Sequence, residues 1–189
     1  LASIDRIDAT PAVKNHWRGV ARFFRACYYS NLVFRYGDVP WYDRVPKLSD
    51  KKEDMDYLYK DRDPRAYVDS CIMADFQYAM DSVRESDGPL QVNRYVVAAM
   101  ASRFMLREGT YLKYHNIDLP LAEKCLTMAK TAAEMVMNSK KYAIAPSYKA
   151  LFVSNDLGTN PEIIMHRHYV DGVLAHSTLT YSFTEAQAG

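Results

Sequence analysis

The sequence contains no long hydrophobic run. Its 189 residues include no uninterrupted apolar stretch of the roughly 18 or more residues that a membrane-spanning helix needs. No charged segment followed by an apolar one stands at the start of the sequence, so we expect a signal peptide to be absent or already removed. The polar Glu185–Gly189 ending leads us to expect a fragment of a longer protein.

The sequence also lacks an excess of charge of either sign. It has 24 Lys and Arg against 23 Asp and Glu, for a net charge of +1, and the two signs are interspersed. A nucleic-acid-binding surface usually shows as a basic patch, and a disordered acidic tail shows as a run of acids. The balance predicts neither feature, and nucleic acid is not an expected partner.

Cysteine is scarce, and the common catalytic motifs are absent. The three cysteines, Cys27, Cys71 and Cys125, lie far apart without CxxC or Cys–His spacing, so we predict buried free thiols rather than a zinc site or disulfides. There is no glycine-rich phosphate loop, GxSxG or HExxH motif. The sequence therefore predicts neither a catalytic residue nor a cofactor, and a helical hydrolase acting through scattered carboxylates is a weaker alternative.

Two polar clusters could indicate a metal site. His166 and His168 would share one face of an extended segment, but a third ligand is missing nearby. Four acidic residues could form a calcium loop, but their spacing lacks the central Gly and the terminal Glu of an EF-hand. They are Asp54, Asp56, Asp61 and Asp63. We predict no metal, and interpret these groups as solvated side chains and helix caps.

Hydrophobic periodicity predicts four long helices. Apolar residues recur at steps of three and four, with capping residues and Gly or Pro at the ends. The predicted helices cover residues 12–36, 63–85, 93–115 and 118–139. Asp63, before Pro64, is the expected cap of the second. A short helix at 147–153 and an extended segment near 162–168 follow.

The first predicted helix has two apolar faces. Trp17, Val20, Ala21, Phe24 and Tyr28 form one stripe, and Phe23, Cys27 and Phe34 form another. A helix of this kind is expected to pack against neighbours on two sides. Its arginines, with those of the third helix, are expected to pair with acids on other helices, namely Asp38, Asp75 or Glu108.

Small residues on the third and fourth helices favour close antiparallel packing. They are Ala98, Ala99, Ala101, Ala122, Ala129, Ala132 and Ala133. Gly109 interrupts the third helix, either for close approach of another backbone or for a kink. Together these features predict an all-α fold of antiparallel helix pairs resembling degenerate tetratricopeptide repeats, with long irregular loops.

The connection over residues 37–62 is long, charged and aromatic. Gly37 ends the first helix and Pro40 prevents it from resuming. Loops of this length in compact domains are usually functional or disordered. Tyr and Trp rings stack on sugar rings while polar neighbours bind hydroxyls, so the candidate ligand-binding residues are Trp41, Tyr42, Asp43, Tyr57 and Tyr59. The favoured alternative for Trp41 is that it packs on the first helix and anchors the loop.

Residues 21–41, ARFFRACYYSNLVFRYGDVPW, resemble the signature helix and turn of the SusD/RagB family. Less specific blocks follow in the family's order, so that the resemblance spans roughly residues 12–165. These blocks are DRD at 61–63, NR at 93–94, EGTYLKYH at 108–115, YKALF at 148–152 and NPEII at 160–164.

The resemblance implies a non-catalytic, mainly α-helical lipoprotein on the outer-membrane surface of Bacteroidetes. Such proteins bind glycans or other nutrients, here an oligosaccharide or a peptide, and pass them to a TonB-dependent transporter barrel of the SusC type. The resemblance also implies that residues 1–189 are one partial SusD-like domain, without the lipid anchor that attaches the full-length protein to the membrane. The alternative is a helical-repeat scaffold that binds only other proteins.

Overall fold

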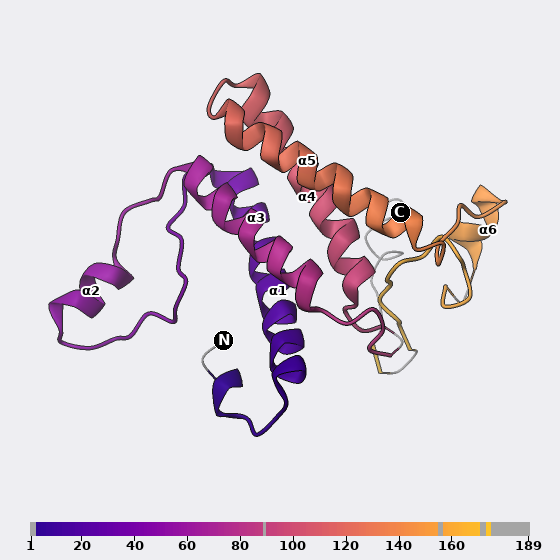
Figure 1. Cartoon of the computed structure of the whole chain (residues 1–189), viewed down its shortest axis with the longest axis horizontal. Helices are drawn as coiled ribbons and strands as arrows, with labels where there is room; N and C mark the ends of the chain where they lie inside the picture. Colours follow the sequence, from indigo (N-terminus) through magenta and orange to yellow (C-terminus); the bar gives the residue numbers. More distant parts are fainter. Residues whose placement is uncertain (1–2, 89, 155–156, 171–172, 175–189) are drawn as a thin grey trace, which may run out of the picture.

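The computed structural model describes residues 3–88, 90–154, 157–170 and 173–174 (Figure 1). These residues form a short 3-10 helix and six α-helices, and their β structure is limited to two isolated bridges. The prediction of an all-α fold is thus confirmed. The elements are η1 (Ile4–Arg6), α1 (Pro11–Tyr36), α2 (Lys52–Leu58), α3 (Arg65–Ser82), α4 (Arg94–Tyr114), α5 (Leu119–Asn138) and α6 (Tyr148–Val153).

The four long helices pack as two pairs. α1 packs against α3 and α4 packs against α5, while contacts between α3 and α4 join the pairs. Successive long helices run in opposite directions (Figure 1). This is the predicted arrangement of antiparallel helix pairs. That residues 1–189 form one domain stays a prediction, since parts of that range lie outside the described residues.

A line of three phenylalanines connects the pairs through the core. The Phe76 ring of α3 lies 6.4 Å from Phe23 of α1 and 6.0 Å from Phe104 of α4. All three side chains are buried, so each removes a large apolar surface from water. Aromatic residues thus lie where the two pairs meet.

Side-chain caps fix most helix starts. The side chains of Thr10, Asn93, Asp118 and Ser147 each accept a backbone N–H from the first turn of the helix that follows. At the end of α1, Gly37 has φ +73° and donates its N–H to the Val33 carbonyl. This backbone conformation favours glycine, so the predicted end of the first helix is confirmed.

The start of α3 corrects one prediction. Asp63 does not cap this helix: Pro64 occupies the cap position, and Asp38 accepts the Arg65 N–H at 2.8 Å. The cap therefore comes from the turn after α1, 27 residues earlier in the chain. The helix also ends at Ser82, three residues before the predicted boundary at 85.

One other segment differs from the prediction, and the segment predicted as extended contains no strand. Residues 37–62 are not entirely irregular, because the seven-residue helix α2 lies within them. Residues 162–168 contain no strand, although Val170 forms an isolated bridge with Leu174. The extended segment has no neighbouring strand among the described residues with which to form a ladder.

Gly109 lies where α4 packs closely against α5. A Cβ atom placed on Gly109 would lie 2.9 Å from Leu126 Cγ and 3.1 Å from both the Ala122 carbonyl oxygen and Cys125 Cβ. Contacts this short to a backbone atom cannot be relieved by rotating a side chain. Of the two predicted explanations for this glycine, close backbone packing is the correct one.

Polar side chains connect the helices inside the bundle. Arg25 of α1 binds Asp75 of α3 through two hydrogen bonds, of 2.6 and 2.9 Å. Arg65 of α3 donates to Glu108 of α4 at 2.5 Å, and both residues are buried. The expected pairing of a first-helix arginine with Asp75 is confirmed, whereas Glu108 is paired from another helix by Arg65, which was not among the arginines predicted for it.

Asp69 is a buried acid beside this second pair. It is inaccessible to solvent, and neither carboxylate oxygen has a hydrogen-bond partner among the described residues. Its nearest cation is Arg65, whose Nε lies 3.7 Å from Oδ2. Burial, and then the charge of Glu108, raise the pKa of Asp69 to about 7 despite the opposing effects of Arg65 and Arg107.

The three cysteines are free thiols. Cys125 is buried, whereas Cys27 and Cys71 are partly buried. Burial raises the pKa of Cys27 and Cys125 to about 12 and also raises that of Cys71.

No helix in the described residues has the length and apolar content to span a bilayer.

We expect Gly109→Ala to destabilise the protein by about 1–3 kcal/mol, because the added methyl group overpacks the α4–α5 contact. An open helical position would respond in the opposite direction, since Ala is favoured over Gly by up to about 1 kcal/mol. Urea denaturation of both proteins measures the difference. A more stable variant would contradict the proposed close packing.

We also expect Asp69 to make stability depend on pH. Since its pKa is raised in the folded state, its contribution is fully present below about pH 4 and is lost as pH rises through about 7. The loss reaches roughly 4 kcal/mol for a pKa raised this far. Asp69→Asn should remove this part of the decline when free energies of unfolding are compared from pH 4 to 8. If the free energy of unfolding declines with pH equally in the variant, a group other than Asp69 is responsible for the decline.

Candidate functional site

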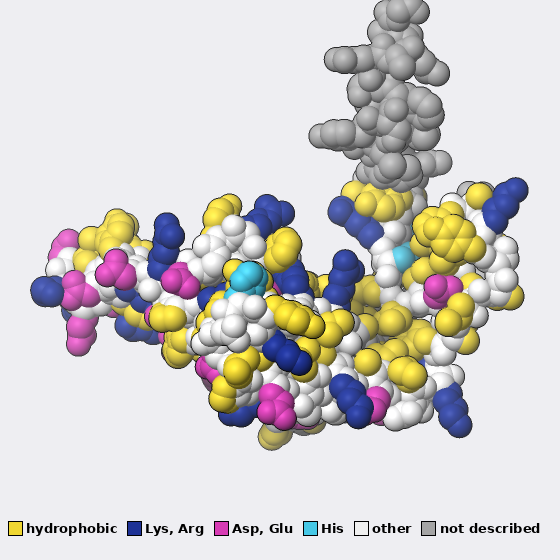
Figure 2. Space-filling model, turned by 90° about the horizontal axis from the view of Figure 1, so that it is seen from above, with side chains coloured by type: hydrophobic (Ala, Val, Ile, Leu, Met, Phe, Trp, Pro, Cys, Tyr) yellow, Lys and Arg dark blue, Asp and Glu magenta, His cyan; other side chains and the backbone are white. Residues whose placement is uncertain are grey.

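The aromatic connection forms an arm that projects from the helical bundle. We call residues 42–62 the arm; α2 lies at its tip, and Figure 1 shows it well to one side of the bundle. In the described structure α2 contacts no other helix. Acidic, basic and hydrophobic side chains intermingle on the arm, which lies at the left of Figure 2. The arm therefore has to be held at its base.

Trp41 anchors the base of the arm. Its ring is only 6% exposed and lies 4.3 Å from the Tyr29 ring, with the Arg25 guanidinium 4.7 Å from its centre. Tyr29 accepts the Tyr42 N–H at 2.8 Å and donates to the Pro40 carbonyl at 3.2 Å. The favoured alternative for Trp41 is confirmed, and the expected exposed stacking ring at this position is wrong, because α1 offers Tyr29 and Arg25 as packing partners.

Asp63 closes the arm at its other end. Its carboxylate accepts the Trp41 N–H at 2.7 Å and a Lys60 ammonium hydrogen at 2.5 Å, and its own N–H donates to the Val39 carbonyl at 3.2 Å. Burial disfavours the charged form of Asp63, but the hydrogen bonds from Lys60 and Trp41 outweigh it and lower the pKa. The ionised carboxylate of Asp63 thus joins the two ends of the arm.

Tyr57 organises the middle of the arm. Its hydroxyl donates to Asp43 Oδ1 at 2.8 Å and accepts the N–H groups of Asp43 and Arg44 at 3.1 and 3.2 Å. The Arg44 guanidinium lies 4.2 Å from the Tyr57 ring centre, and the Tyr42 ring meets Tyr57 edge-on at 5.4 Å. The Tyr42 hydroxyl in turn donates to the Leu58 carbonyl at 2.8 Å. We call Tyr42, Asp43, Arg44 and Tyr57 the arm cluster.

The structure brings together three of the five predicted residues, namely Tyr42, Asp43 and Tyr57. Trp41 lies beneath them at the base. Tyr59 is 72% exposed and makes no ring contact or side-chain hydrogen bond with any described residue. Arg44 is not among the five predicted residues, although a cation beside an aromatic-rich loop was an available signal.

The arm also carries a shallow hollow near its tip. It has a volume of about 480 Å³ and is lined by Leu48, Ser49, Asp50 and Met55. Asp54 accepts a hydrogen bond from Ser49 at 2.7 Å, which fixes the turn that enters α2. The hollow and the arm cluster together give the arm both apolar and hydrogen-bonding surface.

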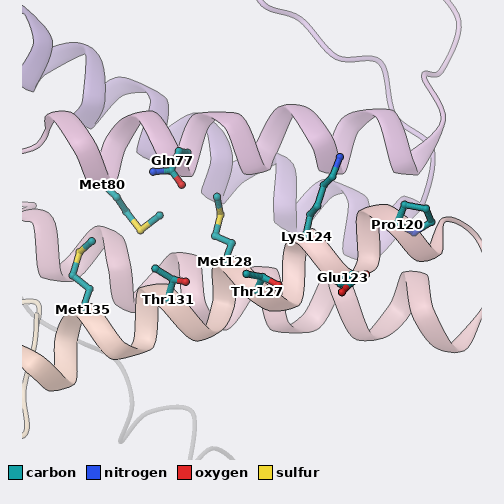
Figure 3. A pocket seen from close by; sticks show the side chains of 9 residues that line it. All are labelled: Gln77, Met80, Pro120, Glu123, Lys124, Thr127, Met128, Thr131 and Met135. Atoms are coloured by element: carbon teal, nitrogen blue, oxygen red, sulfur yellow. The ribbon is translucent and has the colours of Figure 1, made fainter.

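A separate groove lies between α3 and α5 (Figure 3). Its volume is about 580 Å³, and none of the five predicted residues lines it. Figure 3 shows Met80 and Gln77 extending from α3 toward α5, which contributes Met128 and Met135. This groove belongs to the scaffold and not to the arm.

The polar clusters considered for metal binding do not converge. The His166 and His168 rings lie 6.3 Å apart, and the described residues contain no group of three or more His, Cys, Asp or Glu placed to hold an ion. Asp56 pairs with Lys52 at 2.7 Å, while Asp54 and Asp63 make the hydrogen bonds given above. These partners account for three of the four acids considered as a calcium loop.

Comparison with known proteins gives a match at the level of the fold. No protein-family model matches the sequence, and no curated protein does. A SusD superfamily protein from Bacteroides vulgatus aligns with a TM-score of 0.65 at 22% identity, covering 90% of this chain and 33% of its own. A SusD-like carbohydrate binding protein from the same organism aligns with a TM-score of 0.57 at 20% identity, covering 79% and 30%.

The chain has the SusD-like fold. A third solved structure, described as a complex with xylogluco-oligosaccharide, aligns with a TM-score of 0.69 at 20% identity, covering 89% of this chain and 32% of its own. The chain therefore spans about a third of the length of the solved structures that it matches.

We expect Tyr57→Phe to loosen the arm of this SusD-like chain without unfolding the bundle. The change removes the hydroxyl that joins Asp43 to two backbone N–H groups, and a hydrogen bond of this kind contributes about 1 kcal/mol. Amide exchange at Asp43 and Arg44 should become roughly fivefold faster. Tyr59→Phe removes an exposed hydroxyl from the same arm and is the matched control. Equal exchange in both variants would contradict the role of Tyr57.

Proposed function

We propose that this SusD-like chain is part of a non-catalytic protein that binds oligosaccharides at the cell surface. The observation that carries the proposal is the fold, which it shares with a carbohydrate binding protein and with a protein solved with xylogluco-oligosaccharide. The sequence supports the same conclusion, since the blocks that resemble the family run through α1, the end of the arm, α4 and α6 in order.

The arm is the proposed contact surface for the sugar. Tyr59 has an exposed ring whose face can stack on the C–H groups of a pyranose. Asp43 and Arg44 can accept from and donate to sugar hydroxyls, since both are exposed. The Tyr57 hydroxyl holds the Asp43 carboxylate in place through a hydrogen bond, and Trp41 fixes the base of the arm to α1. In this proposal Trp41 and Tyr57 position the site, while Tyr59, Asp43 and Arg44 contact the ligand.

The proposal extends to delivery and location. The full-length protein would be attached by a lipid anchor to the outer membrane and would pass its ligand to a TonB-dependent barrel of the SusC type. The anchored protein would need no catalytic group for this task, because binding and release are sufficient. Isolation of the full-length protein with such a barrel from solubilised outer membranes tests this part.

Calorimetric titration tests the binding proposal. The chain is titrated with xylogluco-oligosaccharides and with a panel of α- and β-linked oligosaccharides, and each mixture is examined for cleavage products. Binding to at least one oligosaccharide without product formation supports the proposal. Cleavage would revive the hydrolase alternative, and failure of every sugar to bind would overturn the proposal.

For any oligosaccharide that binds, we expect Tyr59→Ala and Asp43→Ala to weaken affinity about tenfold each. Loss of one stacking ring or one charge-assisted hydrogen bond corresponds to about 1–2 kcal/mol. Tyr148→Ala is the matched control, since Tyr148 is 80% exposed and α6 lies at the opposite end of the molecule in Figure 1. Equal loss in the control, or no loss in the arm variants, would move the site away from the arm.

A further inference from the structure

The outer face of α1 carries large apolar side chains. Trp17, Phe24, Tyr28 and Leu32 are 46%, 45%, 70% and 40% exposed. At 3.6 residues per turn they fall within an arc of about 80° and extend over about 22 Å of the helix. They form a continuous stripe, which we call the outer stripe, rather than isolated surface residues.

The outer stripe lies opposite the face that packs into the bundle. The buried face of α1 includes Phe23, Ala26, Ser30 and Val33, which lie about 180° away around the helix. The ring contacts of Trp17 and Phe24 are with His16 and Phe23, their neighbours in α1 itself. The described elements therefore cover one apolar face of α1, whereas the sequence predicts packing on two.

The charge on α1 limits what could cover the outer stripe. The helix contains Lys14, Arg18, Arg22, Arg25 and Arg35 and no acidic residue. Asp5 pairs with Arg18, and Asp75 lies within ion-pair distance of Arg22 and Arg25. Lys14 and Arg35 have no carboxylate partner among the described residues. At 100° per residue, Arg35 lies at the same angle as Trp17, within the stripe.

This charge distribution disfavours a second copy of the chain as the partner. Antiparallel packing of two outer stripes would bring Arg35 of each copy toward the Lys14 end of the other. Parallel packing would place each cation beside the same cation of the other copy, so both arrangements bring positive charges together. A partner that is apolar and carries Asp or Glu matches the stripe better.

The length of related structures indicates where such a partner would come from. The SusD-like structures that match this chain contain about three times as much polypeptide as the chain aligns with. Polypeptide beyond the four long helices is thus a regular part of proteins with this fold. A segment attached to the same chain also binds at high effective concentration.

We propose that the outer stripe of α1 is an internal interface, covered by a segment of the same polypeptide encoded outside residues 1–189. The segment presents apolar side chains to Trp17, Phe24, Tyr28 and Leu32, and an acidic side chain to Arg35. The proposal rests on the fold and not on sugar binding, so either can fail alone.

Site-specific photocross-linking tests this proposal in the longest natural polypeptide that contains the sequence. A benzophenone amino acid replaces Tyr28, and the same replacement at exposed Tyr59 of the arm is the control. Intramolecular cross-links from position 28 to residues outside 1–189 support the proposal. Cross-linked dimers, cross-links only to residues within 1–189, or a yield no higher than that of the control would overturn it, as would the absence of any longer polypeptide.

Charge reversal provides a second measurement. Arg35→Glu should lower the melting temperature of the longer polypeptide by several degrees more than that of the 189-residue chain, in which only the favourable position of Arg35 in the last turn of α1 is lost. Arg103→Glu, at an exposed position on α4, is the matched control and should change neither temperature appreciably. Equal effects of Arg35→Glu on both polypeptides would contradict an external acidic partner.

Discussion

The bidentate ion pair between Arg25 and Asp75 is the interaction on which the structure depends most. Asp75 is buried, and an unpaired carboxylate there would be strongly unfavourable. The same guanidinium lies over the Trp41 ring and donates to the Asp43 carbonyl at 3.2 Å. One side chain thus aligns α1 with α3 and positions the first residues of the arm. The packing of the scaffold and the placement of the candidate site therefore depend on the same side chain, Arg25.

The bundle combines close packing with buried polar links. Small residues allow α4 and α5 to approach, and the phenylalanine line fills the space between the pairs. Arg65 and Glu108 join α3 to α4, while Arg107 donates to the Ser30 carbonyl of α1. Such links require fixed helix positions, because a shifted helix would leave a buried charge without its partner. The polar links therefore specify the register of the pairs more than they add to stability.

Most of the scaffold follows from local sequence signals. The four long helices and the stop at Gly37 could be predicted because each depends on residues within one or two turns. The cap of α3 could not, since Asp38 belongs to a segment far away in the sequence. The helix α2 was missed because Lys52–Leu58 is short and mostly charged, without an apolar stripe. Trp41 was correctly interpreted as an anchor, but nothing local predicted that Tyr57 would organise the arm cluster.

The arm is joined to the bundle by side-chain hydrogen bonds and one tryptophan, and no other helix among the described residues packs on α2. Substitutions, insertions or deletions between Arg44 and Leu58 would therefore alter the presented surface without creating cavities in the core. Selection can act on the arm and on the core separately. A lineage under new selection could remodel this one segment while inheriting the same folded frame.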